Sequence, residues 1–271
     1  MLRNITFFTA ILWGIISAAQ IIEVSGADTE FKLQQISPSV LNVSMTTGDI
    51  VTFTEMTDDG EYTRLSLPGF HLSRDVGEPE LPEIHSLIEI PQEALPRIEI
   101  IESSYRDYSL VDLGIEYPIY PAQPSLSKSQ NPGDIPFAKD ADLYLKNTLL
   151  EKDLVSVNIE GQLRAIRIAN LNIRPVDYNP VEGILRVYTS LTINIHMDGA
   201  DFPKTEEIKE VYYSPYFEAI YNQIPNYDSS TRSDDLIGDP VTYVIVANSS
   251  FEGDLDEFIE WKTQKGYHVI V

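Results

Sequence analysis

Hydrophobic and polar residues alternate with a period of two along most of the chain from Thr29 to Asp201, which predicts β-strands with one buried face. The predicted strands cover residues 50–54, 62–67, 98–103, 154–160, 163–168, 184–188 and 191–196. Turn-forming pairs separate several of these strands: Asp59-Gly60, Pro68-Gly69, Glu160-Gly161 and Asp198-Gly199. Many short strands without a long helical pattern favour an antiparallel β-sandwich, which we place at residues 28–227.

The pattern changes after residue 240. Residues 241–247 form a continuous, largely β-branched apolar run, as in a strand that is covered on both faces. Residues 251–262 then carry apolar side chains at helical spacing, and Gly266 occupies a position where helices commonly end. Residues 267–271 resume a strand, which completes one βαβ unit of a parallel sheet. Such a unit cannot bury its own faces, so we expect residues 241–271 to be the truncated start of an α/β domain.

A polar segment separates the two regions. Residues 228–235 read DSSTRSDD and show no apolar period, so we interpret residues 228–240 as a linker. Arg232 is the only basic residue between Lys209 and Lys262. Because exposed linkers are preferred sites of proteolytic cleavage, Arg232 is a candidate cleavage site for a trypsin-like protease. The simpler interpretation of Arg232 is an ordinary charge in a solvated linker.

The first 27 residues have the features of a signal peptide. Arg3 precedes an apolar run at residues 5–16, and small residues follow at two points where cleavage is expected. We predict a signal peptide over residues 1–27 with cleavage after Ala27, or alternatively after Ala19. An N-terminal membrane anchor is the competing interpretation. Export would make the protein secreted or attached to a bacterial cell surface, with membrane contact only through the signal peptide.

One long segment interrupts the strand pattern. Residues 117–138 contain five prolines, which lack the backbone N–H that pairs strands, so this segment is expected to be a surface loop. Loops of this length in compact domains are usually functional or disordered. Lys128 is the only basic residue in the chain between Arg106 and Lys139. It is therefore a candidate functional residue, against the simpler interpretation of a solvated lysine.

Composition excludes several kinds of chemistry. The chain has 42 acidic and 19 basic residues, a formal charge of −23, and this charge disfavours a nucleic-acid partner. It has no cysteine, so it forms no disulfide or thiolate metal site and supplies no thiol nucleophile. The four histidines show no metal-ligand spacing, and no nucleophile-elbow pattern supports a Ser-His-Asp triad. We therefore predict no catalytic residue, no metal and no cofactor.

Four stretches together carry a resemblance to a known family. They are VGEPELP at residues 76–82, IRPVDYNP at 173–180, YSPYFE at 213–218, and the βαβ start with FIEWKTQKG at 258–266. In this order and spacing, the chain resembles the N-terminal part of gingipain-type cysteine peptidases. The resemblance implies a signal peptide, a β-sandwich propeptide and the opening of a caspase-like catalytic domain. It also implies that the propeptide assists folding of the peptidase and blocks its active site until the propeptide is cleaved off.

The resemblance assigns roles to two residues and withholds roles from others. The family places a basic side chain from a propeptide loop in the specificity pocket of the peptidase, and Lys128 is the residue that we choose for this role. Arg232 becomes the candidate maturation site. In the family, the catalytic His and Cys lie well downstream of the βαβ start, so their counterparts are expected beyond Val271. His268 does not match the catalytic His of the family. The implied partner is the peptidase domain of the same precursor. The alternative function is a secreted β-sandwich module that binds glycan or protein at the cell surface.

Overall fold

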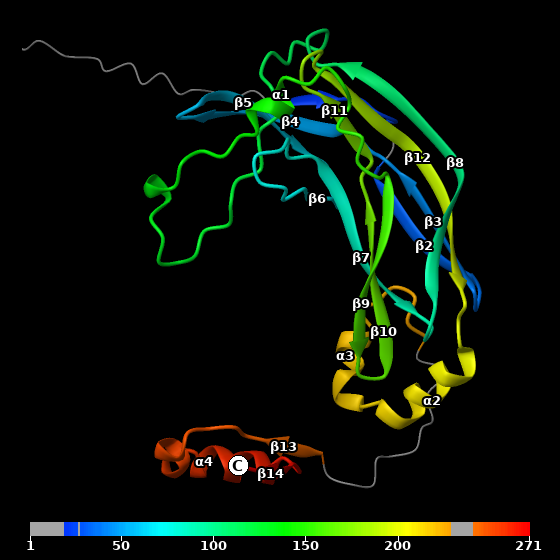
Figure 1. The fold of residues 1–271 in the computed structure, drawn as a ribbon, viewed down its shortest axis with the longest axis vertical. Coiled ribbons are helices and arrows are strands. Elements are labelled where there is room, and N and C mark those ends of the chain that lie inside the picture. Colours follow the sequence, from blue (N-terminus) through cyan, green and yellow to red (C-terminus); the bar gives the residue numbers. More distant parts are fainter. Residues whose placement is uncertain (1–18, 27, 229–240) are drawn as a thin grey trace, which may run out of the picture. The chain divides into compact units, whose positions relative to one another are not determined.

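A computed structural model describes residues 19–26, 28–228 and 241–271 (Figure 1). The chain divides into two compact units, residues 1–229 and residues 230–271. The first unit consists mainly of antiparallel strands, and the second is a small unit with one helix between two strands. The prediction of a mainly β fold with antiparallel sheets is therefore confirmed for the first unit.

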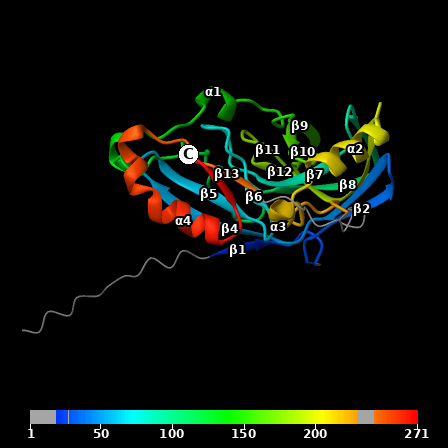
Figure 2. The same ribbon diagram turned by 90° about the horizontal axis from the view of Figure 1, so that it is seen from below.

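The largest sheet of the first unit has five antiparallel strands. They are β2 (Glu30–Ser37), β3 (Val40–Thr46), β8 (Leu95–Ser109), β11 (Val176–Asn179) and β12 (Ile184–Asp198). The order is β11-β12-β3-β2, and β8 pairs with β12 along the whole length of both strands. Figures 1 and 2 show β8 lying beside β12. The two predicted strands at 184–188 and 191–196 are thus parts of a single strand.

A second sheet packs face to face against the first. It has the order β6-β7-β10-β9, with β6 at His71–Leu72, β7 at Pro82–Ile90, β9 at Val155–Leu163 and β10 at Ile166–Ile173. Both sheets contribute to one buried hydrophobic cluster: Leu41, Val43, Ile193 and Ile195 come from the first sheet, and Ile84, Ile88, Leu171 and Ile173 from the second. Alternate side chains are buried along β3 and along most of β12, as a period-two pattern of hydrophobic residues predicts.

One predicted turn is wrong. Strand β9 runs through Gly161 to Leu163, and the chain reverses at Arg164 and Ala165 instead. Gly161 pairs with Ile168 while Ile159 pairs with Ala169, so the ladder has one extra residue and Gly161 lies at a β-bulge. Its φ of +131° suits glycine in either setting, and a bulge and a turn therefore give the same sequence signal.

A third sheet contains a strand formed by residues close to the N-terminus. Its order is β1-β4-β5, with β1 at Gln20–Ile22, β4 at Ile50–Thr57 and β5 at Gly60–Ser66. Ile22 is 1% exposed and Val24 is 4% exposed, and both belong to a hydrophobic cluster with Ile50 and Leu65. The Val24 N–H donates to Asp49 Oδ1 at 2.9 Å. Residues 20–24 are therefore part of the folded β unit.

Short helices close the first unit. They are η1 (Pro132–Asp134), α1 (Ala141–Tyr144), α2 (Phe202–Tyr212), η2 (Pro215–Phe217) and α3 (Glu218–Tyr221). Tyr221 and Ile224 pack on the β9–β10 turn in a third cluster. The Asn226 side chain then bonds both backbone groups of Glu89, each at 2.8 Å. All three core clusters draw their described residues from positions 22–227, so this unit buries its own core and can fold by itself.

The second unit is the predicted βαβ element. Strands β13 (Thr242–Val244) and β14 (His268–Ile270) are parallel, and η4 (Ser249–Asp254) and α4 (Asp256–Gln264) connect them. Gly266 follows α4 with a φ of +92°, as the sequence predicts for a helix end. Val244, Phe251 and Trp261 remain largely exposed within this unit. In the part of the chain that the structure describes, no helix is both long and apolar enough to cross a membrane.

Candidate functional site

The candidate site is the proline loop, which we define as residues 121–140. Figure 1 shows this green segment extending away from the sheets of the first unit. Near the middle of this segment in sequence, the Gln130 N–H donates to the Ser127 carbonyl at 3.1 Å, and the Ser127 N–H donates to Gln130 Oε1 at 2.8 Å. These two bonds form a compact turn, and Lys128 is an exposed residue within it. The structure therefore places Lys128 where another protein can reach it.

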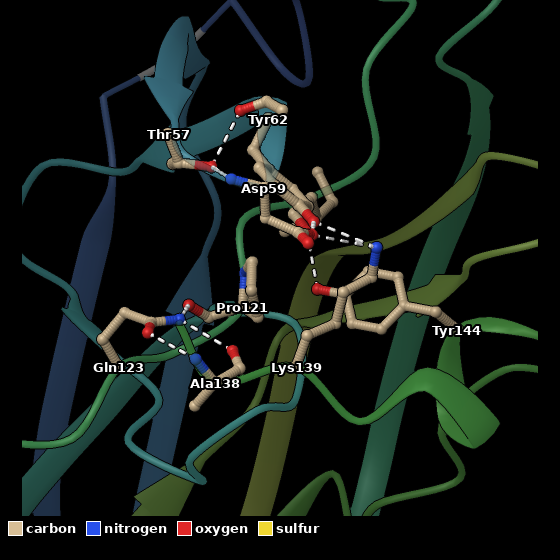
Figure 3. A network of polar contacts seen from close by, with 10 residues as sticks. Thr57, Asp59, Tyr62, Pro121, Gln123, Ala138, Lys139 and Tyr144 are labelled. Carbon is tan, nitrogen blue, oxygen red and sulfur yellow. Dashed lines mark hydrogen bonds and ion pairs between the residues drawn. The ribbon is translucent and has the colours of Figure 1, made fainter. Parts of the chain in front are cut away.

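The base of the proline loop, where its two ends lie side by side, is called the neck. Hydrogen bonds of the Gln123 side chain hold the two ends together (Figure 3). The Gln123 amide accepts from the Ala138 N–H at 2.9 Å and donates to the Ala138 carbonyl at 2.8 Å. The same Nε2 atom also donates to the Pro121 carbonyl at 2.9 Å. Gln123 thus joins the entering segment of the loop, residues 120–123, to the leaving segment, residues 137–140.

Aromatic packing supports the neck. The Phe137 ring lies 5.4 Å from the Tyr62 ring and 5.8 Å from the Tyr120 ring, centroid to centroid. Tyr62 is 2% exposed and belongs to β5, and Tyr120 is also buried. Because aromatic pairs at these distances add to the free energy of simple burial, Phe137 holds the leaving segment against the sheet.

Lys139 adds polar contacts between the neck and β5 (Figure 3). Its Nζ atom donates to the Tyr62 hydroxyl at 3.0 Å and lies 3.7 Å from Asp59 Oδ2. It also lies 5.1 Å from the centre of the Tyr144 ring. The Tyr62 hydroxyl donates to Asp59, and burial, followed by this bond, raises the pKa of Tyr62 above its usual value. The phenol therefore stays protonated, and the network is intact at neutral pH.

The other predicted site residues fall in different places. Ala19 is described and exposed, and it directly precedes β1. Ala27 and Arg232 lie outside the described residues. Among the residues that the structure does describe, no three His, Asp or Glu side chains gather as ligands for a metal ion.

The residues of the neck were not predicted from the sequence. Gln123, Tyr62 and Lys139 come from two distant parts of the chain, and nothing in their local pattern marks them as neighbours. The one available signal was the position of Gln123 between Pro121 and Pro124, two residues that have no backbone N–H to donate.

Comparison with known proteins identifies relatives for most of the chain. The Propeptide_C25 family model matches residues 33–223. Lys-gingipain HG66 of Porphyromonas gingivalis is 36% identical over 215 residues, which are 79% of this chain and 12% of that protein. Gingipain R2 of the same species is 21% identical over 245 residues, which are 90% of this chain and 30% of that protein. The chain thus spans only a small part of the length of these curated relatives.

Two solved structures are similar to the chain. One comes from work on the zymogenic latency of gingipain K from Porphyromonas gingivalis, with a TM-score of 0.63 and 29% sequence identity, covering 68% of this chain and 100% of that one. The other is a complex of the pro- and mature domains of RgpB from the same species. It has a TM-score of 0.59 and 19% identity, and covers 73% of this chain and 98% of that one.

Proposed function

Because the chain belongs to the Propeptide_C25 family and carries the propeptide of a gingipain-like peptidase precursor, we propose that residues 20–228 keep that peptidase latent and assist its folding. One observation carries the proposal: Lys128 is exposed in a loop whose base is fixed. The family match favours this function over a glycan- or protein-binding module.

The proposed mechanism is occupation of the specificity pocket. Lys128 enters the acidic pocket of the peptidase as a substrate side chain would, and the folded unit behind it covers the active site. A loop with a fixed base loses little conformational entropy when it docks, so more of the contact energy remains as affinity. The test is to add isolated residues 20–228 to the mature peptidase of the same precursor, which they should inhibit.

The peptidase itself is a further part of the proposal. We assign residues 241–271 to the start of its caspase-like domain, which the parallel βαβ topology supports. Since the chain has no cysteine, a cysteine nucleophile must be supplied from beyond Val271. Reading the coding sequence onward should reveal a His and then a Cys, each after a buried strand. A continuation without cysteine would contradict the assignment.

Maturation is proposed to occur at Arg232 in the linker at residues 228–240. Asn226 and Tyr227 contact the folded β unit and precede the linker, so a cut at Arg232 leaves the propeptide intact. We expect Arg232→Ala to leave the full precursor uncleaved and latent, whereas Lys265→Ala, at the residue that follows α4, is processed normally. The measurement is N-terminal sequencing of the mature peptidase together with its activity. A wild-type peptidase that starts far from Ser233 would overturn the site.

Export is proposed to follow cleavage after Ala19. Cleavage after Ala27 would remove β1 and the buried side chains of Ile22 and Val24, whereas cleavage after Ala19 leaves them in place. The exported protein is then secreted or retained at the cell surface. We expect the intact mass of the exported protein to correspond to a chain that begins at Gln20. A mass that begins at Asp28 would contradict this choice.

A further inference from the structure

We infer that Gly77 and Gln123 are positioning residues that fix the neck of the proline loop and thereby hold Lys128 in the geometry that the peptidase binds. The inference rests on the proposed inhibitory function and adds to it. It also gives a role to the VGEPELP stretch at residues 76–82, which the fold alone leaves unexplained. Neither residue needs to touch the peptidase.

Gly77 bonds to both segments of the neck. Its N–H donates to the Ala122 carbonyl at 2.8 Å, and its carbonyl accepts from the Asp140 N–H at 2.9 Å. The following residues extend the contact with the entering segment, because the Ala122 N–H donates to the Glu78 carbonyl and the Glu80 N–H to the Tyr120 carbonyl, each at 2.8 Å. Gly77 therefore lies between the start and the end of the loop and holds them together.

Only glycine suits this position. The φ of Gly77 is +85°, a conformation that residues with a side chain rarely adopt. A Cβ atom on residue 77 would lie 3.0 Å from the Asp140 nitrogen and 3.4 Å from the Lys139 carbonyl carbon. Both atoms belong to the backbone of the leaving segment, so a side chain at residue 77 would force this backbone to move by a few tenths of an ångström.

The Gln123 side chain supplies a second connection between the entering and leaving segments of the loop. Pro121 and Pro124 near it have no N–H, and the Ala122 N–H already bonds to the Glu78 carbonyl, so these residues have no backbone donor to offer to the leaving segment. The Gln123 amide offers one acceptor and a donor group to Ala138, in the manner of a backbone partner, and donates to Pro121 as well (Figure 3). The half-buried amide thus replaces the missing backbone bonds.

The consequence is a loop whose two ends are fixed before it meets the peptidase. Fixing the ends removes conformations in which Lys128 points elsewhere, and this lowers the entropy cost of docking. Loss of the neck should therefore reduce affinity while Lys128 itself and the three core clusters remain unchanged.

The experiment uses Gln123→Glu in the unit of residues 20–228. Glutamate has nearly the same shape, but it replaces the donor with an oxygen that faces the carbonyls of Pro121 and Ala138. We expect the inhibition constant for the mature peptidase to rise at least about tenfold, mainly through slower association, with an unchanged melting temperature. Cleavage after Lys128 by a lysine-specific protease should become faster. Gln34→Glu on β2, an exposed position, adds the same charge and should change none of these quantities.

Two further variants complete the test. Gln123→Ala should weaken inhibition in the same direction, and Gly77→Ala should do so more strongly if it folds. The inference is overturned if Gln123→Glu and Gln123→Ala both inhibit like the wild type, or if inhibition and melting temperature fall together. A wild-type unit that does not inhibit at all would overturn the proposed function, and the role of the neck with it.

Discussion

Replacing Lys128 with alanine is expected to weaken inhibition of the mature peptidase by about 100-fold, which is the effect of losing a central residue of an interface. Lys128 is exposed and lies in a turn that backbone and Gln130 contacts maintain. Its removal should therefore leave the melting temperature of residues 20–228 unchanged. The measurement is the inhibition constant against the peptidase of the same precursor.

Two controls make this result specific. Lys146→Ala removes an exposed lysine outside the proline loop and should leave inhibition unchanged. Lys128→Arg keeps the charge and changes only the shape of the cation, so its effect reports how closely the pocket selects lysine over arginine. If Lys128→Ala inhibits as well as the wild type, Lys128 is an ordinary solvated lysine and the proposed mechanism fails.

Removal of β1 should have the largest effect on stability. A unit that begins at Asp28 lacks Ile22 and Val24, each of which is buried in the cluster around Ile50 and Leu65. From the cost of deleting buried aliphatic side chains, we expect a loss of about 5 kcal/mol relative to the unit that begins at Gln20. Such a loss is comparable to the whole stability of many domains. Urea denaturation of the two units measures the difference.

Neighbouring positions on β1 provide a matched control. Ile22→Ala should cost about 2–4 kcal/mol, because Ile22 is 1% exposed and its removal leaves a cavity. Ile21→Ala should cost little, because Ile21 is 62% exposed on the opposite face of the same strand. Equal stability of the units that begin at Gln20 and Asp28 would show that β1 is dispensable, and cleavage after Ala27 would again be possible.

Secondary structure could be predicted from the sequence wherever its pattern involves only residues that are neighbours along the chain. Period-two alternation predicted the strands that became β4, β5, β8 and β12, because consecutive side chains of a strand point to opposite faces of the sheet. The apolar run at residues 241–247, the helical spacing after it and Gly266 predicted the βαβ unit. Strands β2, β3 and β7 were not predicted. These strands were missed because proline normally argues against a strand. Pro38 lies between β2 and β3, and Pro82 is the first residue of β7.

Contacts between distant residues required the tertiary structure. The apolar side chains of Ile22 and Val24 look like the end of a signal peptide until β4 is seen pairing with β1. Gly161 suggested a turn until its pairing with Ile168 showed a bulge.

For the candidate site, the sequence by itself determined that a proline-rich loop carries one isolated lysine, because proline content and charge spacing are properties of neighbours along the chain. Only the tertiary structure decided that this loop has a fixed base. Gly77, Gln123 and Tyr62 come from separate segments, and their hydrogen bonds and ring contacts exist only after the sheets have brought those segments together.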